Sequence, residues 1–285
     1  MCELLGMNCN VPTDIVFSFT GLALRGGRTA PHGDGWGIAL YDGRFARTFL
    51  EPVPACDSPL ARFVRENPIR ALLAVAHVRR RTRGVQTIEN THPFKQALWG
   101  RHWTFAHNGT LPSVKERKLG ELTPLGDTDS EHAFCWMLAE LRAAFPGGYP
   151  EDRLPELWQT VADLAGTLGA EGSFNLLLAD GRHLFARCGT KLCHLVRQAP
   201  FGRATLRDAD VQVDFRALAS DGDRVAIVAT EPLTCDERWI PGAPGSLWVF
   251  EDGALSATLA SGDPSGRPEW SGPPDFTGDA PPRDE

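Results

Sequence analysis

The sequence predicts an α+β fold in which antiparallel strands and long amphipathic helices pack in layers. Short apolar runs alternate with turn signals over most of the 285 residues, as strands do in a folded protein. Two longer segments instead carry their apolar residues at helical spacing. The composition, 42% hydrophobic and 23% charged, is that of an ordinary globular chain with enough apolar residues for a large core.

The strand candidates are rich in Val, Ile, Leu and aromatic residues, and turn residues bound them. Asp180-Gly181 joins two of them with a two-residue hairpin signal, so neighbouring strands are expected to be antiparallel. The candidates are GWGIALY (35–41), ALLAVAHVR (71–79), WTFAHN (103–108), SFNLLLA (173–179), HLFARC (183–188), RVAIVAT (224–230) and SLWVFE (246–251).

The first long helix is expected within residues 127–145. Thr128, with Glu131 three residues later, fits a capping box at its start, so we expect the Glu131 side chain to serve that box. Its apolar face consists of Phe134, Met137, Leu138, Leu141 and Phe145.

The second helix is expected within residues 151–168, and Gly169 is the expected stop signal. Its apolar face consists of Leu154, Leu157, Trp158, Val161, Leu164 and Leu168.

One domain is expected over residues 2–260, followed by an acidic, Pro/Gly-rich and disordered tail over residues 261–285. The net charge of -7 argues against nucleic acid or an anionic membrane as a partner, because both attract a positive field. No signal peptide or membrane-spanning run is present in the sequence, so a cytoplasmic location is expected.

The seven cysteines are odd in number and form no C-x-x-C pair, which argues against a disulfide framework. The cluster CGTKLCH (188–194) has the wrong spacing for a zinc site. We therefore expect no metal and no cofactor.

Four stretches place glycines or polar residues beside a strand: HGDGWGIAL (32–40), AHVRRRTRG (76–84), FAHNGTL (105–111) and GDTDSE (126–131). Each has an ordinary explanation when it is taken alone. The glycines can serve turns and close packing, Asn108-Gly109 is a hairpin signal, and the last stretch starts a helix. Their joint occurrence behind Cys2 is what indicates a functional site.

Cys2 directly follows Met1. Removal of Met1 would leave a thiol and a free α-amine on one residue, which together form a nucleophile and a base. An α-amine with a reference pKa of about 7.7–8.0 suits this task, because the thiol itself titrates near ~8.5. A buried structural cysteine in the first strand is the alternative, and we assign that role to Cys9.

In this combination and order the stretches resemble the class II glutamine amidotransferases, whose catalytic domain belongs to the N-terminal-nucleophile hydrolases. The resemblance covers about residues 2–250 and looks strongest to the small stand-alone branch that lacks a synthase domain. ENTHPF (89–94), SFNLLLADG (173–181) and ATEPLT (229–234) agree with it. It implies a four-layer αββα sandwich with two mainly antiparallel sheets.

The resemblance also implies a role for each site residue. Cys2 is the nucleophile that attacks the γ-amide of glutamine. The Asn108 side chain and the Gly109 backbone N–H stabilise the oxyanion. Arg79 binds the substrate's α-carboxylate, and Asp129 binds its α-ammonium group.

Several neighbouring residues are candidates for supporting roles only. His77 lies two residues before Arg79 and should share its strand face, where a structural hydrogen-bonding role is expected. Trp36 and Gly37 are expected to pack beneath the nucleophile or in the core. His107 is assigned no chemical step.

The sequence departs from the family after Arg79. The family often continues with a large residue and then Ala-Thr, whereas this chain has Arg80, Arg81, Thr82 and Arg83. These arginines either form a solvated loop or enlarge the pocket for a second acidic group, as in a γ-glutamyl compound larger than glutamine.

Three functions are therefore open. The chain could hydrolyse glutamine and hand ammonia to a separate synthase chain. It could hydrolyse a larger γ-glutamyl amide, as a relative in ergothioneine biosynthesis does. It could also be a binding module that keeps the fold and has lost catalysis.

Overall fold

The computed structural model describes residues 2–80, 85–217 and 220–262. Arg81, Arg83 and nearly all of the predicted tail lie outside the described residues. Ser261, the first residue of that predicted tail, is buried, and its hydroxyl accepts a hydrogen bond from Nε of Arg187 at 2.9 Å. None of the helices in the described ranges is long and apolar enough to cross a membrane.

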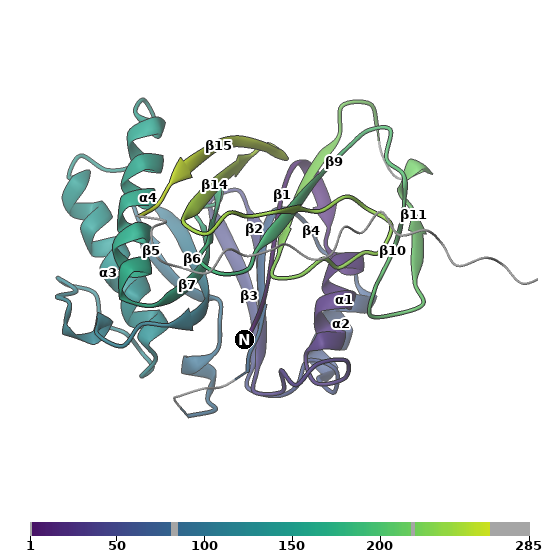
Figure 1. The fold of residues 1–285 in the computed structure, drawn as a ribbon, viewed down its shortest axis with the longest axis horizontal. Coiled ribbons are helices and arrows are strands. Elements are labelled where there is room, and N and C mark those ends of the chain that lie inside the picture. Colours follow the sequence, from purple (N-terminus) through teal and green to yellow (C-terminus); the bar gives the residue numbers. More distant parts are fainter. Residues whose placement is uncertain (1, 81–84, 218–219, 263–285) are drawn as a thin grey trace, which may run out of the picture.

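Two antiparallel sheets form the centre of the molecule (Figure 1). Within the described residues the larger sheet has seven strands in the order β13-β9-β12-β1-β4-β2-β3. These are β1 (Glu3–Asp14), β2 (Trp36–Asp42), β3 (Phe45–Glu51), β4 (Arg70–Val78), β9 (Cys193–Gln198), β12 (Arg224–Ala229) and β13 (Ile240–Pro241).

The smaller sheet has six strands among the described residues, in the order β15-β14-β8-β7-β6-β5. These are β5 (Phe94–Leu98), β6 (Arg101–Thr110), β7 (Ser173–Ala179), β8 (Leu184–Cys188), β14 (Ser246–Glu251) and β15 (Ala254–Ala260). A separate hairpin consists of β10 (Arg203–Thr205) and β11 (Gln212–Asp214).

Helices cover the outer face of each sheet (Figure 1). Helices α1 (Val16–Arg25) and α2 (Pro59–Glu66) lie on the larger sheet, and α3 (Asp129–Ala144) and α4 (Leu154–Glu171) lie on the smaller one. A third buried cluster joins the two sheets and contains Leu4 and Val75 from one and Leu177 and Leu184 from the other. The short 3₁₀ helices are η1 (Ile88–Asn90), η2 (Val114–Glu116) and η3 (Phe215–Ala217).

The predicted four-layer αββα class is confirmed. Every strand candidate overlaps an observed strand, namely β2, β4, β6, β7, β8, β12 or β14, although Gly35, Arg79, His183 and Thr230 lie just outside these strands. The strand pairs are antiparallel. The hairpin turn between β7 and β8 is longer than the two residues predicted. Its cause is the buried Asp180 carboxylate, which accepts hydrogen bonds from the backbone N–H groups of Arg182 at 2.9 Å and His183 at 2.7 Å.

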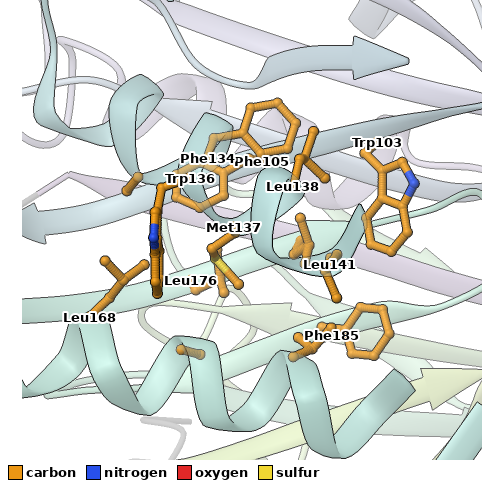
Figure 2. Close-up of a cluster of buried hydrophobic side chains, with 14 of the residues drawn as sticks. Trp103, Phe105, Phe134, Trp136, Met137, Leu138, Leu141, Leu168, Leu176 and Phe185 are labelled. Carbon is orange, nitrogen blue, oxygen red and sulfur yellow. The ribbon is translucent and has the colours of Figure 1, made fainter. Parts of the chain in front are cut away.

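Helix α3 begins as predicted, but its capping box is only half formed. The Thr128 side chain accepts a hydrogen bond from the backbone N–H of Glu131 at 3.1 Å. The Glu131 carboxylate instead accepts from the backbone N–H groups of Leu125 at 2.9 Å and Gly126 at 2.7 Å. The predicted apolar face of α3 is buried against the smaller sheet, where Phe134 stacks on Phe105 with ring centroids 5.2 Å apart (Figure 2).

Helix α4 does not stop at Gly169, as the sequence predicted, but continues to Glu171. A Cβ atom at position 169 would lie 2.1 Å from Nη2 of Arg187. The guanidinium cannot move away freely, because it is buried and donates to the backbone carbonyls of Phe174 at 2.7 Å and Ser261 at 3.1 Å. Gly169 is therefore a packing residue.

Gly169→Ala should destabilise the protein, although alanine is normally favoured over glycine inside a helix by about 1 kcal/mol. Overpacking against Arg187 should lower the free energy of unfolding by about 1–3 kcal/mol, measured by urea denaturation. Gly147→Ala is the matched control, since an added Cβ there meets nothing within 4 Å. A Gly169→Ala protein as stable as the wild type would contradict the packing role.

Candidate active site

Cys2 lies just before β1 and is held by the side-chain amide of Asn108 on β6. The backbone N–H of Cys2 donates to Oδ1 of Asn108 at 3.0 Å, and Nδ2 of Asn108 donates to the backbone carbonyl of Cys2. Because β1 and β6 belong to different sheets, this amide joins the two sheets at the start of the chain. Asn108 is itself buried, so the position of Cys2 is well fixed.

The thiol of Cys2 lies against the backbone of Arg80. The Arg80 N–H donates to Sγ at 3.2 Å, and Sγ lies 3.3 Å from the Arg80 carbonyl oxygen. Burial raises the pKa of the Cys2 thiol, while the Arg80 N–H and the positive charge of Arg79 oppose that rise. A thiol in this position needs a base to become a thiolate.

A cavity of about 170 Å³ opens beside Cys2. Arg79, Gly109 and Asp129 line it together with Cys2, although they come from separate parts of the chain. Asn108 lies directly behind Cys2 through the two bonds described above. The fold therefore brings together all five residues that the sequence named as catalytic or substrate-binding.

Arg79 follows β4 and is positioned by the glycine-rich stretch before β2. Its backbone N–H donates to the Gly35 carbonyl at 2.7 Å, and its carbonyl accepts from the Asp34 N–H at 3.1 Å. Its guanidinium is buried and donates to the Val85 carbonyl at 3.3 Å. This guanidinium supplies a positive charge to a cavity that is partly shielded from water.

Gly109 is required by close packing, because a Cβ atom there would lie 1.7 Å from the carbonyl oxygen of Ser173. Asp129 occupies the first turn of α3. Its carboxylate accepts hydrogen bonds from the backbone N–H groups of Leu111 at 2.8 Å and Ser130 at 2.9 Å. These bonds fix the carboxylate of Asp129, and thus its negative charge, at the wall of the cavity that Arg79 also lines.

Two further residues, Asn90 and His92, belong to the site but were not singled out by the sequence. Nδ2 of Asn90 donates to the Asp127 carboxylate at 2.7 Å, and the Asp127 N–H donates back to Oδ1 of Asn90 at 2.9 Å. This pair joins the stretch ENTHPF to the stretch GDTDSE. His92 lines the cavity, and the polar residues before Phe94 were the signal that could have indicated it.

The three predicted supporting residues do not line the cavity within the described part of the chain. His77 is fully buried with its ring centroid 4.4 Å from that of His92. Both of its ring nitrogens are buried without a close hydrogen-bond partner among the described residues, and the expected hydrogen-bonding role stays a prediction. Trp36 packs in the outer core against Phe19. A Cβ at Gly37 would lie 2.3 Å from the His92 carbonyl oxygen, so Gly37 lets that loop approach β2.

His107 has a structural position and also reaches the cavity wall. Its Nδ1 lies 2.9 Å from Oγ of Ser130, and its Nε2 lies 3.1 Å from the Ser173 carbonyl oxygen. Burial lowers the pKa values of His77, His92 and His107. These rings are therefore neutral near pH 7 and add no charge beneath the site.

Comparison with known sequences gives a consistent result. The family model described as "Glutamine amidotransferases class-II" matches residues 1–273. The chain is 49% identical over 250 residues to YafJ of Escherichia coli K12, a provisionally named glutamine amidotransferase, covering 88% of this chain and 97% of YafJ. A provisionally named glutamine amidotransferase of Haemophilus influenzae is 42% identical over 259 residues, covering 91% of this chain and 87% of the relative.

Comparison with solved structures agrees. The crystal structure of a predicted glutamine amidotransferase from Pseudomonas aeruginosa has a TM-score of 0.72 and 40% identity, covering 90% of this chain and 100% of that one. Glutamine phosphoribosylpyrophosphate amidotransferase of Bacillus subtilis has a TM-score of 0.59 at 14% identity, covering 91% of this chain and 49% of that one. The second similarity concerns the fold alone.

The buried histidines should make the fold sensitive to acid. Burial lowers the pKa of His77 to about 3, whereas an unfolded histidine titrates near ~6.5. Between these two pKa values the unfolded chain binds more protons than the folded protein. The contribution of His77 to stability is therefore fully present above the unfolded pKa and is lost as the pH falls towards the folded pKa. We expect His77 to contribute about 2 kcal/mol to the loss of unfolding free energy between pH 7 and pH 5.

The measurement is urea denaturation of the wild type and of His77→Leu at both pH values. The variant should lose less stability than the wild type on acidification, whatever its stability at pH 7. Equal losses in the two proteins would show that His77 is not held neutral by burial.

Proposed function

Because the chain belongs to the class II glutamine amidotransferase family, we propose that it cleaves the γ-amide of glutamine through a γ-glutamyl thioester on Cys2, releasing glutamate and ammonia. The observation that carries this proposal is the shared cavity. It has a thiol, a guanidinium and a carboxylate on its wall, from Cys2, Arg79 and Asp129. These groups match the reacting amide, the α-carboxylate and the α-ammonium of one amino acid.

The first step requires removal of Met1, which exposes the α-amine of Cys2. That amine takes the thiol proton, and the thiolate attacks the γ-carbonyl carbon to form an S–C bond. The α-ammonium then gives its proton to the departing nitrogen as the C–N bond breaks, and ammonia leaves. The bond between the Cys2 backbone nitrogen and Oδ1 of Asn108 supports this role, because it would hold the amine in place.

The tetrahedral intermediate is stabilised by Asn108 and Gly109 in this mechanism. An amide NH₂ group has two hydrogens, and one of those on Asn108 is directed to the Cys2 carbonyl. The second hydrogen is donated to the oxyanion in this proposal, together with the Gly109 N–H. Loss of one such donor typically costs about 10²- to 10³-fold in rate.

The second step hydrolyses the thioester. Water gives a proton to the α-amine and attacks the carbonyl carbon, forming a C–O bond. The C–S bond then breaks, the Cys2 sulfur is reprotonated and glutamate leaves. No cofactor is needed for either step.

Substrate recognition rests on opposite charges in this proposal. A guanidinium binds a carboxylate through two parallel hydrogen bonds, which is the role proposed for Arg79. The carboxylate of Asp129 binds the α-ammonium. A cytoplasmic location and transfer of ammonia to a separate synthase chain stay predictions from the sequence.

Cys2→Ala should abolish glutaminase activity, measured as glutamate release, because no other thiol lines the cavity within the described residues. Cys9→Ala is the matched control. Cys9 is buried in β1, with Sγ 3.2 Å from the Ala71 carbonyl oxygen, so its loss should leave turnover nearly unchanged.

Circular dichroism and thermal unfolding should show that the Cys2→Ala protein keeps its fold. Glutamate release by a folded Cys2→Ala variant would refute the mechanism. If the correctly processed wild type also fails to release glutamate, the binding-module alternative becomes the better account.

A further inference from the structure

A second cavity, of about 450 Å³, lies next to the active-site cavity. Arg80 lines both cavities, and Glu3, the residue after Cys2, lines the second one. Its volume falls within the range of about 300–1,000 Å³ that is usual for small-molecule sites. The ammonia released from glutamine would occupy very little of this space.

The wall of the second cavity carries many charges, but most are already paired. Arg25 lies 3.2 Å from the Glu3 carboxylate and 2.8 Å from the Asp208 carboxylate. Lys191 forms an ion pair with Glu231. These pairs make the cavity polar without giving it a strong net charge.

Arg80 differs from these residues. Its side chain is exposed, and no carboxylate among the described residues forms an ion pair with its guanidinium. It therefore offers a cation, at the boundary between the two cavities, to an anionic group of a ligand. Its backbone N–H also lies 3.2 Å from Sγ of Cys2, so this cation belongs to the residue that flanks the nucleophile.

We propose that the second cavity receives the amine part of a γ-glutamyl amide, and that this amine carries a carboxylate that binds Arg80. The substrate class is a γ-glutamyl amino acid or γ-glutamyl peptide. The proposal rests on the function proposed above and specifies which amide the same thiol cleaves.

The reach of the substrate is consistent with this assignment. Reacting atoms lie about 3–3.5 Å apart when a nucleophile is ready to attack, so the scissile amide must lie close to Sγ and to Arg80. In a γ-glutamyl amino acid the carboxylate is attached to the carbon next to the scissile nitrogen. A group that close to the nitrogen lies near Arg80, whose backbone contacts Sγ of Cys2 and which lines both cavities.

The chemistry is the same as for glutamine apart from the leaving group. The Cys2 sulfur forms a bond with the γ-carbonyl carbon, and the C–N bond breaks. The α-ammonium of Cys2 gives its proton to the amino acid nitrogen, and the free amino acid leaves through the second cavity. Water then hydrolyses the thioester and releases glutamate.

The test compares γ-glutamyl-alanine with γ-glutamyl-alaninamide, in which a neutral carboxamide replaces the carboxylate proposed to meet Arg80. Glutamine is the reference substrate, and kcat/KM is measured for all three from glutamate release. The wild type should prefer the acid over the carboxamide by about tenfold or more, as expected for a charge-assisted contact. Arg80→Gln should bring this ratio close to one.

Arg62→Gln is the matched control, because Arg62 is exposed on α2 and lines neither cavity; it should keep the wild-type ratio. If Arg80→Gln does not fold, the ratio in the wild type still decides the question. Turnover of glutamine with equal kcat/KM for the two alanine compounds would overturn the subsite alone. Turnover of none of the three substrates would refute the proposed function, and the subsite with it.

Discussion

The arrangement of the site depends on the two hydrogen bonds between the backbone of Cys2 and the side-chain amide of Asn108. They join the central strand β1 of the larger sheet to β6 of the smaller sheet. A residue near the start of a chain normally frays, whereas Cys2 is held through both its backbone N–H and its backbone carbonyl. The same amide that fixes the thiol is also the one proposed to stabilise the oxyanion, so position and catalysis are coupled in one side chain.

The remaining motifs interlock around this pair. Gly35 and Asp34 bind the backbone of Arg79 on both sides, and Asn90 binds Asp127 through two reciprocal bonds. The missing side chain of Gly37 admits the backbone of His92. Each stretch therefore supplies either a charge to the cavity or the backbone contact that holds another stretch, which explains physically why the motifs occur together.

Much of the fold and most of the site could be predicted from local signals. Apolar runs indicated β4 and β12, which flank β1, and β6, β7 and β8 of the smaller sheet, but not the central strand β1 itself. Helical spacing indicated α3 and α4, and position 2 indicated the proposed nucleophile. Long-range contacts were harder to predict. Asn8 in β1 is a poor strand signal, because a polar side chain is not expected at a buried strand position. It is buried there because its side chain donates to the Arg182 carbonyl at 3.1 Å and accepts from the Gly253 N–H at 2.8 Å. Gly169 has the sequence signal of a helix stop, yet it is a packing residue inside α4, because Arg187 of strand β8 lies against it. The second cavity depends on residues as distant as Glu3 and Lys191, which no local pattern connects.

In the proposed function, Cys2 becomes an N-terminal nucleophile in a site that recognises a glutamine-like group. The most direct measurement is the intact mass of the purified protein before and after incubation with 6-diazo-5-oxo-norleucine, a glutamine-analogue electrophile. We expect a mass that lacks Met1, followed by a single stoichiometric adduct that peptide mapping assigns to Cys2. A processed protein that forms no adduct, or an adduct on another cysteine, would contradict it.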